Sequence, residues 1–162
     1  MTDAEKVNFH FDLWTQPWIG LEKLDGGFVR LGIEDTLLGS HEFRGFFDPS
    51  PLVVVGIHRL LTAILQDIFS PESEEELKQL WTMQQLSAEM LTTFQANYGD
   101  RFDLFSQEEP FFQSMDTSST PAKGENIKSA AYLFHDIPSG TEHTHYRHGV
   151  QTDQIFCPVC VA

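Results

Sequence analysis

Basic residues are scarce in this chain of 162 residues, where ten Lys and Arg stand against 24 Asp and Glu, for a net charge of −14. The basic residues are scattered singly along the sequence, and no two are adjacent. A domain that holds nucleic acid by neutralising phosphates normally carries a basic face. The sequence shows no such face, so any contact with nucleic acid would come from loops, backbone amides, aromatic stacking, basic partner proteins or further chain.

Long apolar runs and targeting segments are also missing. No apolar run reaches the ~20 residues that a membrane span needs, and the first residues lack the basic and apolar regions of a signal peptide. We therefore expect a cytoplasmic protein without a membrane partner. The chain has only two cysteines, Cys157 and Cys160. In a reducing compartment this pair favours metal ligation or simple packing over a disulfide.

Recognisable catalytic motifs are absent from the sequence. It holds neither a phosphate-binding glycine loop nor a Gly-x-Ser-x-Gly nucleophile motif. His41 with Glu42 could serve acid-base chemistry, but such a pair without a nucleophile or pocket is more often a surface pair. His58 lies beside apolar neighbours, as a hydrogen-bonded core or surface histidine does. No set of residues here assembles a catalytic site, and we expect no enzymatic activity.

The first third of the chain predicts strands followed by a long helix. Apolar and polar residues alternate over residues 9–31 around a Gly26-Gly27 turn, which is typical of a β-hairpin or small meander. Residues 33–40 could form one or two helical turns. Residues 48–69 give the strongest helix signal, with Ser50 placed to accept from the first free amides and Pro51 at the first helical position.

A second helical region follows at Ser70-Pro71, where a run of glutamates suits the positive end of a helix. An amphipathic stripe then continues to Gly99, and one helix or two that meet near Met83 would both fit it. Residues 100–113 are expected to be irregular and packed by aromatics, and residues 114–140 to be loops. The predicted fold class is α+β: a small N-terminal β-hairpin or meander followed by helices and long loops.

Histidines and cysteines cluster at the end of the sequence, in the order His143-x-His145-x2-His148-x8-Cys157-x2-Cys160. A Cys-x2-Cys turn places two thiolates on one side of a loop, and two imidazoles complete the tetrahedron that zinc prefers. The predicted ligands are His145, His148, Cys157 and Cys160, with His143 as the alternative. Four protein ligands leave no position for a substrate water, so this zinc would be structural. Surface histidines and cysteines packed as small apolar residues remain the simpler alternative.

Several stretches resemble one protein family, in the same order along the chain. They are Phe11-Asp12-Leu13-Trp14-Thr15-Gln16-Pro17-Trp18-Ile19, Ser50-Pro51-Leu52 leading into His58-Arg59-Leu60-Leu61-Thr62-Ala63-Ile64-Leu65, Arg101-Phe102-Asp103-Leu104-Phe105, and Pro110-Phe111-Phe112-Gln113. Together they are similar to the N-terminal part of CasA, the large subunit of Cascade, the type I-E CRISPR surveillance complex. The aromatic residues of these motifs have the size to fill a core.

The resemblance implies a fold and a function. CasA-like proteins are much longer, with a large mixed α/β N-terminal domain and a C-terminal helical bundle, so residues 1–162 would be a truncated N-terminal portion. The family is not enzymatic. It recognises the short motif that flanks the DNA target and helps to open the duplex, while base pairing with the guide reads the target. The implied partners are other Cascade subunits, guide RNA, target double-stranded DNA and a recruited helicase-nuclease.

One family loop can be carried onto matching positions. In CasA-like proteins a loop that follows a Phe-containing triplet reaches toward the 5′ handle of the guide and the flanking motif. Phe134, His135 and Asp136 occupy the triplet here, and residues 137–156 the loop. A neutral Asn is familiar at the third position, whereas Asp136 would repel phosphate. Phe134 could stack on a base, since aromatic faces bind bases without charge.

Two other classes of function fit parts of the sequence. A zinc-stapled protein-interaction module without a nucleic-acid role would suit the acidity of the chain. A small metallohydrolase would use three of the clustered ligands, with Glu142 or Asp136 beside the metal in a cleft. The number of filled metal ligands separates a structural site from a hydrolytic one.

Overall fold

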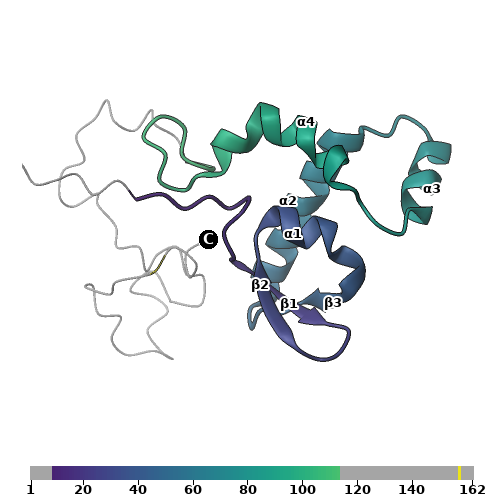
Figure 1. The fold of residues 1–162 in the computed structure, drawn as a ribbon, viewed down its shortest axis with the longest axis horizontal. Coiled ribbons are helices and arrows are strands. Elements are labelled where there is room, and N and C mark those ends of the chain that lie inside the picture. Colours follow the sequence, from purple (N-terminus) through teal and green to yellow (C-terminus); the bar gives the residue numbers. More distant parts are fainter. Residues whose placement is uncertain (1–8, 114–156, 158–162) are drawn as a thin grey trace, which may run out of the picture. The chain divides into compact units, whose positions relative to one another are not determined.

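A computed structural model describes residues 9–113 and Cys157. The chain divides into two compact units, residues 1–111 and 112–162, and the first unit contains all the helices and strands described here. In chain order (Figure 1) they are β1 (Ile19–Lys23), β2 (Phe28–Leu31), α1 (Ile33–Leu38), the 3-10 turn η1 (Ser40–Glu42), β3 (Phe43–Phe46), α2 (Pro51–Phe69), α3 (Glu74–Thr82), α4 (Ala88–Tyr98) and the 3-10 turn η2 (Gly99–Phe102). An antiparallel sheet followed by helices confirms the predicted α+β class.

The predicted hairpin is present, and a third strand extends it. β1 and β2 pair antiparallel from Ile19 opposite Leu31 to Glu22 opposite Phe28. Gly26 turns the chain with φ of 86°, a left-handed value that glycine adopts without strain. The third strand, β3, pairs antiparallel with the other edge of β1, giving the order β2-β1-β3. Residues 9–17, which the alternation placed in the same meander, form only an isolated bridge outside this sheet.

Helix α2 begins at Pro51, as predicted, but its start is held differently. Ser50 does not cap the helix with its side chain, and the Asp48 carboxylate instead accepts a hydrogen bond from the Ser50 N–H at 2.8 Å. One face of α2 is buried, through Ile57, Leu61 and Ile64, which helical periodicity places on one side.

The length and composition of α2 would also suffice to cross a membrane, and 17% of its most apolar stretch is buried. Core helices of soluble proteins meet the same criterion, so this is weak support for a membrane span. The absence of a membrane partner stays a prediction.

Two helices, not one, occupy residues 74–98. The first begins later than the Ser70-Pro71 signal predicts, because Ser73 is the capping residue and its hydroxyl accepts from the Glu76 N–H at 3.2 Å. Extended backbone at Met83 ends α3, and α4 starts after Ser87. The break therefore lies at Met83, where the sequence pattern allowed either one continuous helix or two.

An aromatic cluster ties the N-terminal segment to α4 and η2. Trp14 is buried, and its ring lies 5.5 Å from that of Phe94 and 5.2 Å from that of Phe102, between centroids. Leu91 of α4 is fully buried as well. The expectation that the motif aromatics fill the core is thus confirmed for Trp14 and Phe102. It is wrong for Phe105 and Phe112, which are 37% and 87% exposed.

Candidate functional site

The residues predicted to bind metal or nucleic acid fall mostly outside the described part of the chain. Cys157 is described, and it is exposed. The others lie among residues whose structure is not described: Phe134, His135, Asp136, His143, His145, His148 and Cys160. Within residues 9–113 and Cys157, no group of three or more His, Cys, Asp or Glu side chains could hold a metal ion. The zinc and loop predictions therefore stay predictions.

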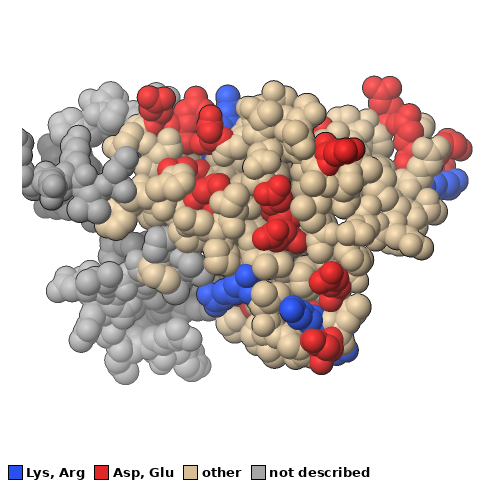
Figure 2. Space-filling view, in the orientation of Figure 1, with Lys and Arg blue, Asp and Glu red and all other residues tan. Residues whose placement is uncertain are grey.

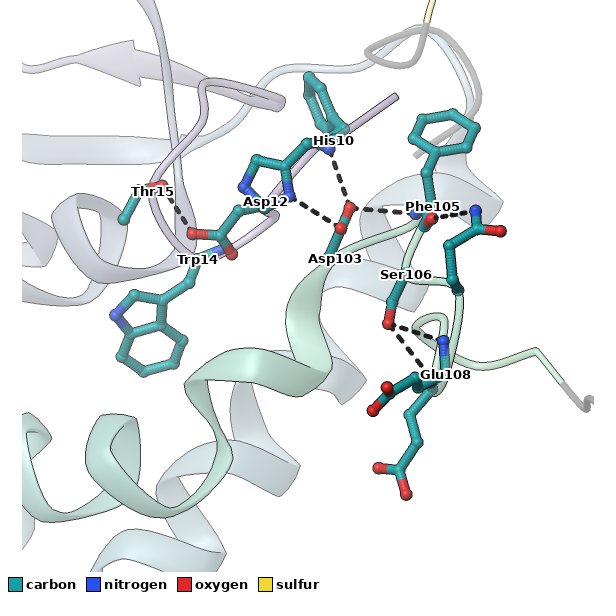
Figure 3. Close-up of polar contacts among 11 residues, drawn as sticks. His10, Asp12, Trp14, Thr15, Asp103, Phe105, Ser106 and Glu108 are labelled. Atoms are coloured by element: carbon teal, nitrogen blue, oxygen red, sulfur yellow. Dashed lines mark hydrogen bonds and ion pairs between the residues drawn. The ribbon is translucent and has the colours of Figure 1, made fainter. Parts of the chain in front are cut away.

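The best-defined polar site among the described residues centres on Asp103 (Figure 3). One carboxylate oxygen of Asp103 accepts hydrogen bonds from the backbone N–H groups of Phe11 at 2.9 Å and Phe105 at 3.0 Å. The other lies 2.7 Å from Nδ1 of His10. A single side chain thus joins the N-terminal segment to the turn that follows η2.

Backbone pairing surrounds this carboxylate. Asp12 and Asp103 form an antiparallel bridge, in which the Leu13 N–H donates to the Phe102 carbonyl and the Leu104 N–H to the Phe11 carbonyl, both at 3.0 Å. The bridge lets the Asp103 side chain reach the Phe11 amide. We call the contacts of His10, Phe11 and Asp103, together with this bridge, the Asp103 junction.

Asp12 shapes the chain on the other side of the bridge. Its carboxylate accepts from the Trp14 N–H at 2.9 Å and from the Thr15 hydroxyl at 2.7 Å. Such a side-chain turn fixes the direction of the backbone where Trp14 enters the core. The adjacent Leu13 carbonyl accepts from Nε1 of Trp18 at 2.9 Å, which satisfies that indole N–H.

The environment of the junction shifts the pKa values of its two charged groups. Burial of the Asp103 carboxylate raises its pKa, but the N–H donors of Phe105 and Phe11 and the contact with His10 outweigh this, so the pKa lies below the ordinary value. The hydrogen bond and the charge of Asp103 raise the pKa of His10 above 6.5. Both shifts favour the ion pair.

The Asp103 junction holds two segments of the chain together. One oxygen of its carboxylate accepts from the N–H groups of Phe11 and Phe105, and the other contacts Nδ1 of His10. Asp103 lies in one of the sequence motifs, but its contacts with His10 and Phe11 were not predicted from the sequence. The only local signal was the Arg101-Phe102-Asp103-Leu104-Phe105 stretch, and nothing in it points to His10.

The two other histidines weighed from the sequence take no part in a site among the described residues. Nε2 of His41 lies 3.8 Å from a carboxylate oxygen of Glu42, and both side chains are exposed, as expected of a surface pair. His58 of α2 is exposed, with its ring edge-on to that of Phe46 at 4.5 Å between centroids.

Charge is distributed unevenly over the face in Figure 2. Acidic side chains gather over α3 and near the turn after η2, and basic atoms are few and separated. Three of the basic side chains pair with acidic neighbours: Arg44 with Glu22 at 3.1 Å, Lys78 with Glu74 at 2.9 Å and Arg101 with Glu109 at 3.4 Å. This view thus shows no basic stripe of the kind that tracks a phosphate backbone.

Comparison with known proteins decides the family. The profile of the CRISPR-associated protein Cse1 family matches residues 12–162. The chain belongs to this family. It is also 33% identical over 139 residues to the CRISPR-associated protein CasA/Cse1 of Thermus thermophilus, a match that covers 85% of the chain. The resemblance to CasA drawn from the four sequence motifs is thereby confirmed.

Solved Cse1 structures share the fold. The crystal structure of Cse1 from Acidimicrobium ferrooxidans matches 78% of the chain with a TM-score of 0.71 and 31% identity, over 24% of its own length. A chain of a CRISPR RNA-guided surveillance complex matches 76% of this chain with a TM-score of 0.66, over 27% of its own length. At 24% identity this likeness concerns the fold alone. The chain spans about a quarter of the length of its Thermus relative, 26%.

Proposed function

We propose that this chain is the N-terminal part of a non-catalytic subunit of an RNA-guided DNA surveillance complex of the Cascade type. Membership of the Cse1 family carries the proposal. The fold shared with a chain of a CRISPR RNA-guided surveillance complex supports it. In this role the protein acts in antiviral defence in the cytoplasm, together with other Cascade subunits and guide RNA.

The finer role that we propose is recognition of the motif that flanks the DNA target, with contact to the 5′ handle of the guide. The loop that begins at Phe134, His135 and Asp136 would face the nucleic acid. Phe134 would stack on a base, which requires no positive charge and suits an acidic chain. The complex would then bind target double-stranded DNA and recruit a helicase-nuclease to degrade it.

Assembly is the deciding experiment. The full-length protein is mixed with the guide-bound remainder of the complex and separated by size-exclusion chromatography, and we expect co-elution. A protein that folds but does not co-elute would refute the proposed role.

A point variant tests the loop. We expect Phe134→Ala to co-elute but to bind target DNA about 5- to 140-fold more weakly, since one base–aromatic stack contributes about 1–3 kcal/mol. Phe28→Ala, on the exposed surface of β2, is the matched control. Equal affinity of Phe134→Ala and the unaltered complex would exclude stacking at Phe134.

We also propose a structural zinc ion held by His145, His148, Cys157 and Cys160, with His143 as the alternative ligand. Two thiolates with two imidazoles form a donor set that zinc favours. Zinc would anchor the C-terminal end of the loop that begins at Phe134. This site alone would also suit a protein-interaction module, and a metallohydrolase would need an open coordination position.

Metal analysis of the purified protein tests this site. We expect about one zinc per chain, lost in Cys157→Ser and in Cys160→Ser, because removing a thiolate leaves three ligands. His135→Ala, outside the proposed ligand set, is the control and keeps its metal. Protein that retains zinc in both cysteine variants would rule out this ligand set.

A further inference from the structure

Helices α2 and α3 enclose an apolar groove of about 280 Å³. Its walls come from the C-terminal half of α2, from α3 and from the segment that follows α3. The principal apolar side chains are Leu65, Phe69, Leu77, Leu80, Trp81 and Met83. In Figure 1, α3 is joined to α2 and α4 only by extended connections. The groove thus separates a short helix from the rest of its unit.

The α3 wall presents large apolar side chains to solvent. Trp81 is 90% exposed and Leu77 57% exposed, and no residue of α3 is buried. Large apolar side chains grouped beside a concave surface mark interaction sites more often than isolated exposed residues do. Tryptophan is the side chain most enriched among residues that dominate binding energy at protein interfaces. The groove therefore has the features of a docking site.

The charge around the groove is strongly negative. From Gln66 to Glu89 inclusive, the chain holds six acidic residues and one basic residue, Lys78, which is paired with Glu74 at 2.9 Å. Figure 2 shows the acidic atoms gathered over α3. A partner with acidic groups or phosphates along its sides would be repelled here, and one with lysines or arginines would be attracted.

We propose that this groove binds a basic amphipathic helix of a partner protein. Helices that dock in grooves insert apolar side chains spaced at i, i+3 or i+4, and i+7, and keep polar residues outside. A dry cavity of roughly 150 Å³ accommodates a benzene ring, so this groove has room for about two side chains of that size. Lysines and arginines on the flanks of the helix would meet the glutamates of α3. The inference does not depend on the proposed role in DNA recognition.

A peptide-binding experiment with the full-length protein tests the proposal. The probe is a fluorescent 18-residue helical peptide with leucines on one face and lysines elsewhere. The matched peptide carries glutamate in place of every lysine. By fluorescence anisotropy we expect the lysine peptide to bind, the glutamate peptide to bind at least about tenfold more weakly, and the affinity to fall as salt rises.

Surface variants locate the binding. We expect Trp81→Ala to weaken binding of the lysine peptide about 30-fold, as loss of an interface hot spot does, and Glu75→Lys, which reverses one exposed charge of α3, to weaken it about fivefold. Leu52→Ala is the control. Leu52 is 66% exposed and lies ten residues before Thr62, the first groove residue, or about 15 Å along α2. All these side chains are exposed, so circular dichroism should show unchanged folding.

Four outcomes would overturn the proposal. No binding of the lysine peptide by the full-length protein would mean that the rest of its own chain covers the groove. Equal affinity for the glutamate and lysine peptides would show that the acidic residues near the groove do not select a basic partner. An equal loss in Leu52→Ala would reveal non-specific adsorption. Self-association that Trp81→Ala abolishes, measured by sedimentation, would assign the groove to a second copy of the protein.

Discussion

Asp103 holds together two parts of the chain that are far apart in sequence. Its lowered pKa means that the carboxylate stabilises the fold above the ordinary Asp pKa of 3.8, and this contribution is lost as the pH falls through the lowered value. The raised pKa of His10 affects stability at higher pH. Its contribution is complete below pH 6.5 and is lost as the pH rises through the raised value. The ion pair of His10 and Asp103 therefore contributes most to the stability of the fold at mildly acidic pH.

Replacing the carboxylate should reveal this coupling directly. In Asp103→Asn we expect the pKa of His10 to fall toward 6.5, because its charged partner is gone. NMR titration of the His10 imidazole measures the change. Glu34→Gln removes the same charge from α1 and should leave the titration of His10 unaltered. A His10 pKa that does not move in Asp103→Asn would contradict the junction.

No local pattern could have predicted this pair. His10 and Asp103 are 93 residues apart, and neither lies in a helix or strand whose periodicity would place it. Hydrophobic alternation put residues 9–17 in the β-meander, because Phe11 and Leu13 fit a strand. They are buried instead by pairing and packing against residues around Phe102, a tertiary contact that no local sequence signal carries.

Helix α4 contributes to stability through a small buried face. Leu91 is fully buried, and Phe94 stacks on Trp14. We expect Leu91→Ala to lower the free energy of unfolding by about 2–5 kcal/mol, since it leaves a cavity in the core. Leu52→Ala, on the exposed side of α2, should change it by less than about 0.5 kcal/mol. Chemical denaturation followed by circular dichroism compares the two, and equal losses would show that α4 is not packed as described.

Two glycines provide a second matched comparison. A Cβ at Gly32, just before α1, would lie 2.5 Å from the Trp14 carbonyl oxygen, so Gly32→Ala should destabilise the fold by about 1–3 kcal/mol. A Cβ at Gly56, inside α2, would meet nothing within 4 Å. Gly56→Ala should stabilise by about 0.5–1 kcal/mol, because alanine favours the helix. Thermal unfolding of both variants checks the opposite signs.

The local elements with strong signals could be predicted. Alternation and the Gly26-Gly27 turn give the hairpin, and Pro51 with the apolar face of α2 gives the start of that helix. The strand β3 was missed because Phe43–Phe46 is four residues long and contains a glycine, and only its pairing with β1 makes it a strand. The sequence predicted the wrong start for α3 because Ser70 and Ser73 are both suitable capping residues, and Ser73 is the one used.

The acidity of residues 1–162 limits how this part of the protein can contact DNA. With a net charge of −14 and basic residues that are few and scattered, the chain has little to offer a phosphate backbone. Family membership was predictable from the order of four motifs, and composition alone would have pointed away from nucleic acid. The proposed loop and zinc residues depend on residues outside the described part, so both remain predictions.

Isolated protein should therefore bind random duplex DNA poorly. We expect no retardation in a gel-shift assay at about 10 µM protein, at either 50 or 200 mM salt, since non-specific binders reach 10⁻⁴ to 10⁻⁶ M through basic contacts, and basic residues are scarce in this chain. The assembled complex with its guide serves as the positive control. Retardation that weakens steeply with salt would indicate a basic surface on the protein itself.

The 93-residue span of the Asp103 junction sets the order in which the chain can fold during synthesis. The hairpin and α1 join residues that are near in sequence, so their partners leave the ribosome early. At about 5–20 residues per second, Asp103 follows His10 by roughly 5–20 s. Until then Trp14 lacks the rings of Phe94 and Phe102 that cover it. A ribosome that stalls before residue 103 would therefore present an uncovered aromatic segment to chaperones and proteases.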